Sequence, residues 1–544
     1  MPACQECQQE FTVTPQDDKF RKRVSPQTRD KTYPFPAPTL CADCRQMRRL
    51  VWRNERHLYP RDCDLCGEKS LSIYHEKHPF PVYCLPCWWS DKWDGTKYGR
   101  DFDFSQPFFK QFKKLQDTVP RMMVQQQQNE NSEYTANVSH LKNCYLLFSS
   151  DFNRDCYYGV WVGNSEDSLD NFIINKCRLT HEAIFSDNIY NCSFVIHSSQ
   201  CSDSAFLLDC KSCSNCFMCY GLRNKKFCIA NKQYSEEDYN KELSKLPISS
   251  YKNYEHFKNH YEQMIKKAPY LYLWRNGRIE DSSGDFLTDV KSCHNCYEIT
   301  EGRDCKNVQS GYQVIDAHDC SYVHGELGYE NCECFPMPMK SAFNLNTYNG
   351  HDVYYNDMCM NNNSNIWGCV SLKKSKHCLL NKQYTPEEYE ELLPRVINHM
   401  KETGEYGEFF PAKLSPFDYH ETNAEDFVPL HKNSHQKPSL EPTYDLPDDI
   451  NDTPESVTNE VLACKKCHKN YRIIQQEYKL LKKLGLPLPR LCFECRNAAK
   501  SRFRKPRTLH NRKCAGCKQA IQTNYSPDHP EQVFCEECYL KRVY

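Results

Sequence analysis

Asn231-Lys232-Gln233-Tyr234 closes a cysteine-rich segment, Lys142–Tyr239, and almost the same ending, Asn381-Lys382-Gln383-Tyr384, closes a second one, Lys291–Tyr389. Each ending runs directly into a sequence with the signals of a helix start. Internal repetition constrains the architecture more strongly than any single element, because both copies should adopt one structure. The sequence therefore predicts two like halves at the centre of the chain.

Within each half, cysteines and aromatic residues recur at multiples of three, and Asn, Asp and Ser turns separate short apolar strings. Like positions, such as Cys177 and Cys201 or Cys192 and Cys216, lie about 24 residues apart. Brief β-rich strings with polar corners at such a period predict a parallel β-helix. No apolar period of 3.6 residues runs long enough to favour helices. The alternative is a string of small metal knuckles without a common core.

The densest cysteine run within the halves is Cys210, Cys213, Cys216 and Cys219. It resembles an iron–sulfur run only superficially, because a ferredoxin-type run has three residues before its last cysteine and a proline after it. The second half keeps only one comparable pair of cysteines. Since cysteine is small and apolar, we expect these side chains to stack in ladders inside the coils. A metal site, most simply for zinc, stays open as the alternative.

Helices are predicted at the ends of both halves and before the first. Stretches rich in tyrosine and lysine, Glu236–Lys267 with a break near Pro247 and Glu387–Thr403, would cover strand edges that are otherwise exposed. Pro107–Leu115 alternates aromatic residues with lysines, which predicts a short amphipathic helix. The polar stretch Gln125–Asn131 predicts a loop or cap.

Paired Cys-x2-Cys knuckles bracket the centre at both ends of the chain. Two such knuckles can present four sulfurs to one ion at about 2.3 Å, and the closed tetrahedron leaves no position for a catalytic water. We therefore expect four structural Zn²⁺ sites, in which metal binding supplies folding energy of order 10 kcal/mol or more. The predicted ligands are Cys4, Cys7, Cys41 and Cys44; Cys63, Cys66, Cys84 and Cys87; Cys464, Cys467, Cys492 and Cys495; and Cys514, Cys517, Cys535 and Cys538.

Basic residues follow the second knuckle of the first and third sites. A helix that leaves a second knuckle is the treble-clef arrangement, and a cationic face on it suits phosphate contacts. Phe503 and His510 interleave with the C-terminal basic stretch, as in many nucleic-acid-binding surfaces. The alternatives are a solvated charge run or pairing with acids elsewhere in the chain. The residues predicted to bind nucleic acid are Arg45, Arg48, Arg49, Arg53, Arg56, Arg496, Lys500, Arg502, Arg504, Lys505 and Arg507.

Composition bounds the function classes. The 544 residues carry a formal net charge of −1, so polyanion binding must depend on local patches. The start of the sequence lacks the signals of a secretory leader, and no apolar run approaches the ~18 residues of a membrane helix. We expect a cytoplasmic chain whose 35 cysteines stay reduced; the alternative is a secreted disulfide protein.

The predicted fold class is mainly β: a duplicated parallel β-helix-like solenoid, flanked by tandem four-cysteine zinc-ribbon or treble-clef modules, with short capping helices. Six parts are predicted along the chain. They are a tandem zinc module (1–100), a bridging helix and loop (101–141), two solenoid halves with capping helices (142–270 and 271–410), an acidic proline-rich linker (411–463) and a second tandem zinc module (464–544).

Two family resemblances follow from these motifs. The stretch from Cys464 to Arg496 resembles the zinc-ribbon family of small bacterial proteins, with two knuckles around a short helix, a proline and a closing Cys-x2-Cys-Arg. Cys4–Arg45 is similar but has a longer loop. The whole chain also resembles an uncharacterised cysteine-rich family of candidate-phylum bacteria with small genomes, through Val82–Asp94 and the two Asn-Lys-Gln-Tyr endings. These resemblances imply zinc, a cytoplasmic location and a bacterial origin, and no activity.

The features together favour a non-enzymatic zinc protein that binds DNA or RNA through the basic helices. The rival interpretation is a protein-interaction scaffold built on the β-helix. A carbohydrate-active β-helix enzyme is the third, although the acids of the two halves show no recurring pair. Those acids are Asp203, Asp209, Asp316, Asp319 and Glu326. No membrane partner or small-molecule substrate is indicated.

Overall fold

The computed structural model of the chain describes residues 1–428 and 441–543 and divides into two compact units. The first comprises Met1–Val124 and Leu273–Leu430, and the second comprises Gln125–Tyr272 and His431–Tyr544. The N-terminal cysteine pairs therefore fold with the second central half, whereas the C-terminal pairs fold with the first.

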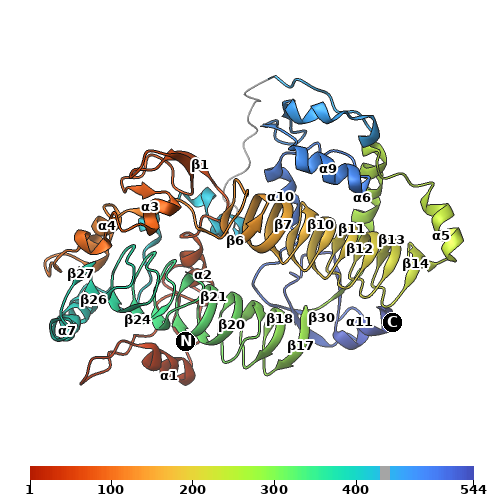
Figure 1. Cartoon of the computed structure of the whole chain (residues 1–544). Helices are drawn as coiled ribbons and strands as arrows, with labels where there is room; N and C mark the ends of the chain where they lie inside the picture. The colour runs from red at the N-terminus through yellow and green to blue at the C-terminus, as the bar shows by residue number, and fades with distance from the viewer. Residues whose placement is uncertain (429–440, 544) are drawn as a thin grey trace. The chain divides into compact units, whose positions relative to one another are not determined.

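In the second unit, the central half is a solenoid of parallel strands, whose coils Figure 1 shows side by side. Each residue pairs with the residue twelve positions later, as Thr180 does with Cys192 and Cys192 with Ser204. The spacing of about 24 residues seen in the sequence thus spans two coils. The strands are β5 (Gln126–Gln127), β6 (Ala136–Lys142), β7 (Tyr145–Gly163), β8 (Glu166–Leu169), β9 (Phe172–Asn175), β10 (Arg178–Asp187), β11 (Tyr190–Ile196), β12 (Ser202–Leu208), β13 (Ser214–Tyr220) and β14 (Lys226–Ile229).

Backbone corners set the shape of each coil. From Gln128 to Ala230, nearly every third residue has a positive φ in the left-handed region. A corner after every third residue gives a twelve-residue coil four short sides, each with one residue pointing inward. Asn and Asp tolerate this conformation and fill many corners, but Trp161 and Phe194 adopt it as well. The strain of these bulky corners is sustained because ladders on both sides fix the backbone.

The interior of the narrow coils holds cysteines together with aliphatic side chains such as Leu147 and Ile189, and one of its columns holds only small side chains. One inward column reads, coil by coil, Cys144, Cys156, Ser168, Thr180, Cys192, Ser204, Cys216 and Cys228. The Cys192 thiol donates to the carbonyl of Tyr190 at 3.2 Å, and the Ser204 hydroxyl makes the equivalent bond to Ser202 at 2.6 Å. Cysteine and serine are therefore interchangeable here, and the cysteines form the expected ladder.

We expect Cys192→Ser to be nearly neutral and Cys192→Leu to destabilise the solenoid by about 1–3 kcal/mol. Serine can repeat the hydrogen bond to Tyr190, whereas leucine must force extra atoms between closely stacked coils. Native-state hydrogen exchange of the β11 amides measures both effects, with the wild-type chain as reference. A leucine variant as well protected as the serine variant would contradict this packing.

A second solenoid forms the centre of the first unit. Its interior again holds cysteines, among them Cys293, Cys320 and Cys378. The register varies in this solenoid: Ser321 pairs with Cys332 eleven residues later, whereas Cys332 pairs with Leu345, and Val353 with Ile366, thirteen residues later. The strands are β17 (Arg275–Glu280), β18 (Gly284–Lys291), β19 (Cys296–Thr300), β20 (Gln309–His318), β21 (Ser321–Tyr329), β22 (Cys332–Cys334), β23 (Met339–Ala342), β24 (Gly350–Tyr354), β25 (Asn363–Trp367) and β26 (Lys376–Leu379).

The repeated Asn-Lys-Gln-Tyr endings close both solenoids. Each forms a short strand, β15 (Lys232–Gln233) or β27 (Lys382–Gln383), that turns back antiparallel on the last coil. Helices follow as predicted: α5 (Glu236–Leu243), α6 (Tyr251–Lys267) and α7 (Pro386–Glu402). Tyr239 of α5 and Tyr389 of α7 are buried. Each free strand edge is thus paired before the capping helix begins.

Two expectations for the flanking segments need revision. The first solenoid begins at β5, so Gln125–Asn131, expected as a loop or cap, already belongs to the first coil. The expected linker 411–463 is in part outside the described residues. Its described C-terminal part is attached to α6, because Asp448 accepts from the Ser250 hydroxyl at 2.5 Å and from the Lys252 amide at 2.9 Å.

The predicted amphipathic helix is α4 (Phe108–Gln116), which packs onto the second solenoid. The Phe108 ring lies 5.4 Å from the ring of Tyr355, and the Phe112 ring lies 4.6 Å from that of Phe410. Across the described residues, we find no helix that combines the length and apolar character needed to cross a bilayer.

Candidate metal centres

The sixteen cysteines predicted as ligands meet in four groups of four. Within each group all four sulfurs lie within 4.8 Å of one another. The Sγ–Sγ distance is 3.7 Å for Cys7 and Cys41, 3.8 Å for Cys66 and Cys84, and 3.6 Å for Cys467 and Cys492. Four sulfurs at about 2.3 Å from one ion form a tetrahedron with edges of about 3.8 Å. Each group is therefore a centre that could hold a metal ion.

The four centres share one local construction. The first pair of cysteines lies in a tight turn, in which the amide of the first cysteine donates to the carbonyl five residues later, at 2.9 Å in Cys4 and Cys63. The residue after the second cysteine has a positive φ, which lets both sulfurs face the same side. These residues are Gln8, Gly67, His468 and Lys518.

The second pair of each centre lies at the start of a helix. These helices are α2 (Ala42–Leu50), α3 (Leu85–Trp89), α10 (Phe493–Ser501) and α11 (Glu536–Val543). Free amides and the helix dipole at such an end favour negatively charged sulfur. Hairpins precede three of the helices: β1–β2 (Tyr59–Asp62, Lys69–Ser72), β28–β29 (Leu462–Ala463, Asn470–Tyr471) and β30–β31 (His510–Lys513, Ala520–Thr523). This construction fits zinc-ribbon-like modules.

The first centre departs from the others in its loop, as expected. The loop contains α1 (Pro15–Val24), which begins with a capping box between Thr14 and Asp17. Lys306 of the second solenoid binds both carboxylate oxygens of Asp17 at 2.8 Å. The long loop therefore attaches the first centre to the solenoid of its unit.

The surroundings of the first cysteine in each centre favour its thiolate, the form that binds metal. Burial raises the pKa of these thiols, but hydrogen bonds from backbone amides outweigh burial. The pKa of Cys63 falls to about 7, and the pKa values of Cys4, Cys464 and Cys514 fall to about 6. One such bond joins the Cys84 amide to the Cys63 sulfur at 3.2 Å. The thiolate is thus favoured at the first cysteine of each centre, where a metal would require it.

The inner cysteines are arranged differently. Cys210, Cys213, Cys216 and Cys219 occupy four successive sides of one coil, and each thiol donates to the carbonyl two residues earlier. Over residues 1–428 and 441–543, the only groups of three or more potential ligand atoms that lie mutually within 4.8 Å are the four terminal ones. The ladder interpretation explains these inner cysteines without a metal.

The cationic helix of the first centre faces inward. Arg45 lies 2.6 Å from Asp319, Arg48 lies 2.7 Å from Glu408, and Arg49 is fully buried beside Glu330. Arg53 pairs with Glu333 while its guanidinium lies over the ring of Tyr322, and Arg56 pairs with Asp426 at 2.7 Å. The Arg residues of α2 and the turn after it therefore dock the module on the second solenoid of the same unit.

The C-terminal centre repeats this arrangement. Arg496 binds Asp170 and, at 3.0 Å, Glu477, while Lys500 lies 2.9 Å from Asp170. Arg502 pairs with Glu262 at 2.9 Å but remains half exposed, and Lys505 lies 3.7 Å from Glu531. Arg504 is half-buried and Arg507 is buried. Arg496, Lys500 and Arg507 are thus buried within their unit, whereas Arg502 stays on the surface; that these cations bind nucleic acid stays a prediction.

The acids that receive these cations were missed by the sequence analysis. Asp170, Asp319, Glu330 and Glu333 all occupy left-handed corners of the coils, from which their carboxylates point outward. A recognised twelve-residue period would have placed them on outer faces, but it would not have shown which faces the modules cover. Whether the chain binds nucleic acid through other surfaces stays a prediction.

Comparisons with known proteins add little to the geometry. No protein-family model matches the chain, and no curated protein matches its sequence. A crystal structure from Desulfovibrio desulfuricans G20, described as a "putative acetyltransferase", shares 8% identity with a TM-score of 0.09; the match covers 50% of this chain and 81% of that one. A likeness this weak carries no conclusion about fold or function.

Proposed function

We propose that the chain is a non-enzymatic scaffold that holds four zinc ions and binds a protein partner on the open faces of its solenoids. The observation that carries this proposal is the use of the cationic helices in docking. Helices α2 and α10 contact buried carboxylates through Arg45, Arg49, Arg496 and Lys500. A phosphate backbone would have to displace these ion pairs, at the cost of leaving buried carboxylates unpaired.

Zinc is the metal that best suits the centres. Four thiolates at tetrahedral spacing with no open position are typical of structural zinc sites. Soft thiolate ligands also exclude magnesium and calcium, which prefer oxygen. The metal in this proposal stabilises the frame and takes no part in a reaction.

The first solenoid offers an ordered outer face for a partner. Arg154, Glu166, Arg178 and Tyr190 follow one another at the twelve-residue register along one side. Arg178 and Tyr190 are exposed. Stacked strands space such side chains at about 4.8 Å, so the face presents a rigid regular array. Solenoids commonly bind partners through extended surfaces of this kind.

Three of the five carboxylates considered for a carbohydrate-active enzyme are held in ion pairs. Asp209 lies 2.8 Å from Arg223 and is also bonded by Tyr539, Asp316 lies 2.7 Å from Arg23, and Asp319 pairs with Arg45. These carboxylates are held in ion pairs, which gives them a role in folding that requires no substrate.

A crosslinking experiment tests the scaffold directly. A photoreactive phenylalanine analogue replaces Tyr190 on the open face or, as the control, Trp89, an exposed aromatic residue on a metal module. In cells that make the protein, we expect a discrete protein adduct from position 190 and none from position 89. Adducts from position 89 alone, or adducts with nucleic acid, would favour the rival function.

We also expect no steep salt-dependent binding of single-stranded DNA, duplex DNA or RNA. Six phosphate contacts would make affinity fall by about 10³-fold or more between 50 and 200 mM salt. Fluorescence anisotropy of labelled oligonucleotides at these two concentrations measures the slope for the wild type and for Arg48→Ala and Arg502→Ala. Binding that weakens steeply with salt and is lost in either variant would favour nucleic-acid binding over the scaffold function.

A further inference from the structure

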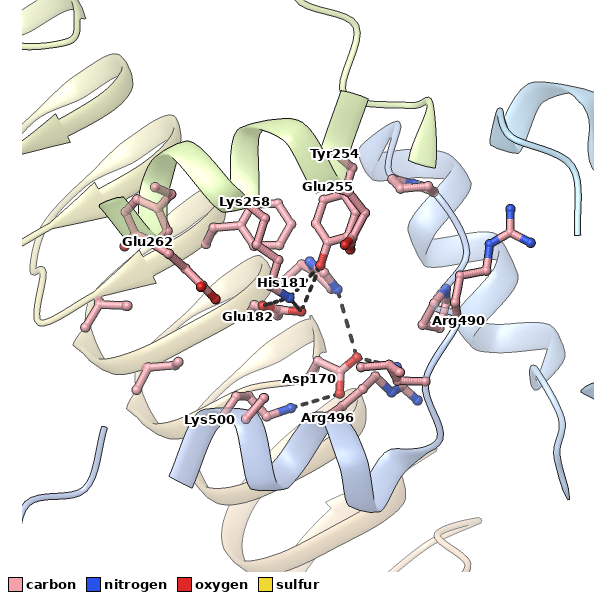
Figure 2. Close-up of a pocket in the computed structure, with 18 of the residues that line it drawn as sticks. Asp170, His181, Glu182, Tyr254, Glu255, Lys258, Glu262, Arg490, Arg496 and Lys500 are labelled. Carbon is pink, nitrogen blue, oxygen red and sulfur yellow. Dashed lines mark hydrogen bonds and ion pairs between the residues drawn. The ribbon is translucent and has the colours of Figure 1, made fainter. Parts of the chain in front are cut away.

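The second unit contains a cavity that its scaffold role does not require. It is about 90 Å³ in volume and lies between the outer face of the first solenoid, helix α6 and the segment that leads into α10. Figure 2 shows its lining, with His181 and Asp170 from the solenoid, Lys258 from α6 and Lys500 from α10 around one space.

Two carboxylates close to His181, Asp170 and Glu182, are paired with cations. Asp170 is held by Arg496 and Lys500, so its pKa falls to about 2 although burial opposes ionisation. Glu182 lies 3.4 Å from Lys258, whose ammonium group also binds the Tyr254 hydroxyl at 2.8 Å. Arg490, also in the lining, donates to the backbone carbonyls of Leu446 and Pro447 instead of to a carboxylate. Beside Asp170 and Glu182, however, a charged ligand would lose its hydration without gaining a free counter-charge.

Three buried polar atoms of the wall have no partner: Nε of Arg490 and of Arg496, which are donors, and Nδ1 of His181. His181 is 7% exposed, and its Nδ1 is buried without a hydrogen bond. Its other ring nitrogen, Nε2, lies 3.9 Å from Asp170. Burial lowers the pKa of His181 to about 4, so the ring is neutral near pH 7. The adjacent carboxylate favours the proton on Nε2, which leaves Nδ1 as a hydrogen-bond acceptor.

Apolar and aromatic side chains form another part of the wall, alongside charged residues such as Glu262 and Arg490. The ring of Phe194 meets the His181 ring edge-on at 5.2 Å, and Tyr254 lies 5.2 Å from Phe194. Ile184, Ile196 and Leu488 also line the space. An apolar cavity with few, convergent polar groups is typical of small-molecule sites.

We propose that this cavity binds an uncharged single-ring aromatic molecule with one hydrogen-bond donor, of the phenol class, and that the donor bonds to Nδ1 of His181. The ion pairs of Asp170 and Glu182 disfavour a charged ligand beside His181, the apolar part of the wall accepts a ring, and the unpartnered nitrogen selects a hydroxyl or N–H group. The cavity, at about 90 Å³, is smaller than the dry cavity of about 150 Å³ that accommodates benzene, so the ligand can contain no more than one ring.

Titration of the metal-loaded full chain with phenol, followed by saturation-transfer NMR and calorimetry, tests this site. Anisole replaces the donor with a methyl ether, and benzoate replaces it with a charge. We expect both to bind at least 10-fold more weakly than phenol. Equal affinities for phenol and anisole, or no phenol binding at millimolar concentration, would overturn the proposal.

Substitutions at two positions test separately the hydrogen-bond acceptor, Nδ1 of His181, and the volume of the cavity. His181→Asn can place its amide oxygen near the position of Nδ1 and should retain phenol affinity within about threefold, whereas His181→Leu should lose at least 10-fold. Ala499→Phe, on the cavity wall, should abolish binding by filling the space. Metal content and thermal unfolding establish whether each variant is folded. If a variant does not fold, the comparison of phenol with anisole on the wild-type chain tests the proposal instead. His181→Leu with wild-type affinity would overturn the proposal.

Discussion

Replacing Cys464 with serine is expected to reduce the metal content from four ions to three and to unfold the third centre together with the docking of α10. Cys464 is fully buried, and the other three ligands of its centre cannot complete a closed tetrahedron without it. Metal binding contributes folding free energy of order 10 kcal/mol per structural site. The other interactions within so short a module cannot replace that free energy when the metal is lost.

Elemental analysis measures the metal count, and hydrogen exchange of the α9 (Gln475–Leu484) and α10 amides measures the unfolding. Cys192→Ser is the matched control, because it removes a buried thiol of the solenoid and should leave four ions bound. Four ions in the Cys464→Ser variant, or protected amides in α10 after complete removal of metal by a chelator, would contradict the assignment of this centre.

Replacing Glu330 with alanine is expected to destabilise the first unit by about 3–5 kcal/mol. Its carboxylate lies 3.2 Å from Arg48, 3.5 Å from Arg45 and 3.6 Å from Arg49, and it is almost completely buried. Removal of the anion would leave these guanidinium groups in a dry interface with less compensating charge. The docking of α2 on the second solenoid should weaken more than the solenoid itself.

Native-state hydrogen exchange of the α2 amides measures this loss, since unfolding of a two-unit chain need not follow two states. Glu326→Ala is the matched control, because Glu326 lies on the same strand, β21, and is exposed. It should change stability by no more than about 0.5 kcal/mol. Equal protection of α2 in both variants would show that the ion pairs do not hold the module.

Cysteine spacing predicted the solenoid and the four centres, but not the length of a coil. In the column that contains Cys192, the next coil carries Ser204 and the following one Cys216. Cysteine therefore returns after two coils and suggests twice the true period. The substitution is possible because both side chains donate to the same backbone carbonyl position, a property that a pattern of residue types does not reveal.

Local sequence could not predict whether the cationic side chains face solvent or the interior of their unit. Arg45 and Asp319 are far apart in the chain, as are Arg496 and Asp170, and their pairing depends on which solenoid each module joins. Arg45, Arg48 and Arg49 lie on α2, but Arg53 and Arg56 follow the end of that helix, so the five arginines do not share one helix face. Whether such a face meets solvent, nucleic acid or buried carboxylates is decided by tertiary packing, which amphipathic spacing alone does not specify.

The triplet geometry of the coils also restricts how this chain can change in length. Adding or removing three residues would rotate all following positions by one side, which would carry inward side chains to a different column. Steps of twelve residues preserve the columns, and the eleven- and thirteen-residue registers at Cys332 show that a single-residue difference can be absorbed within one coil. We therefore expect the chain to tolerate insertion or removal of a whole coil better than insertion or removal of three residues.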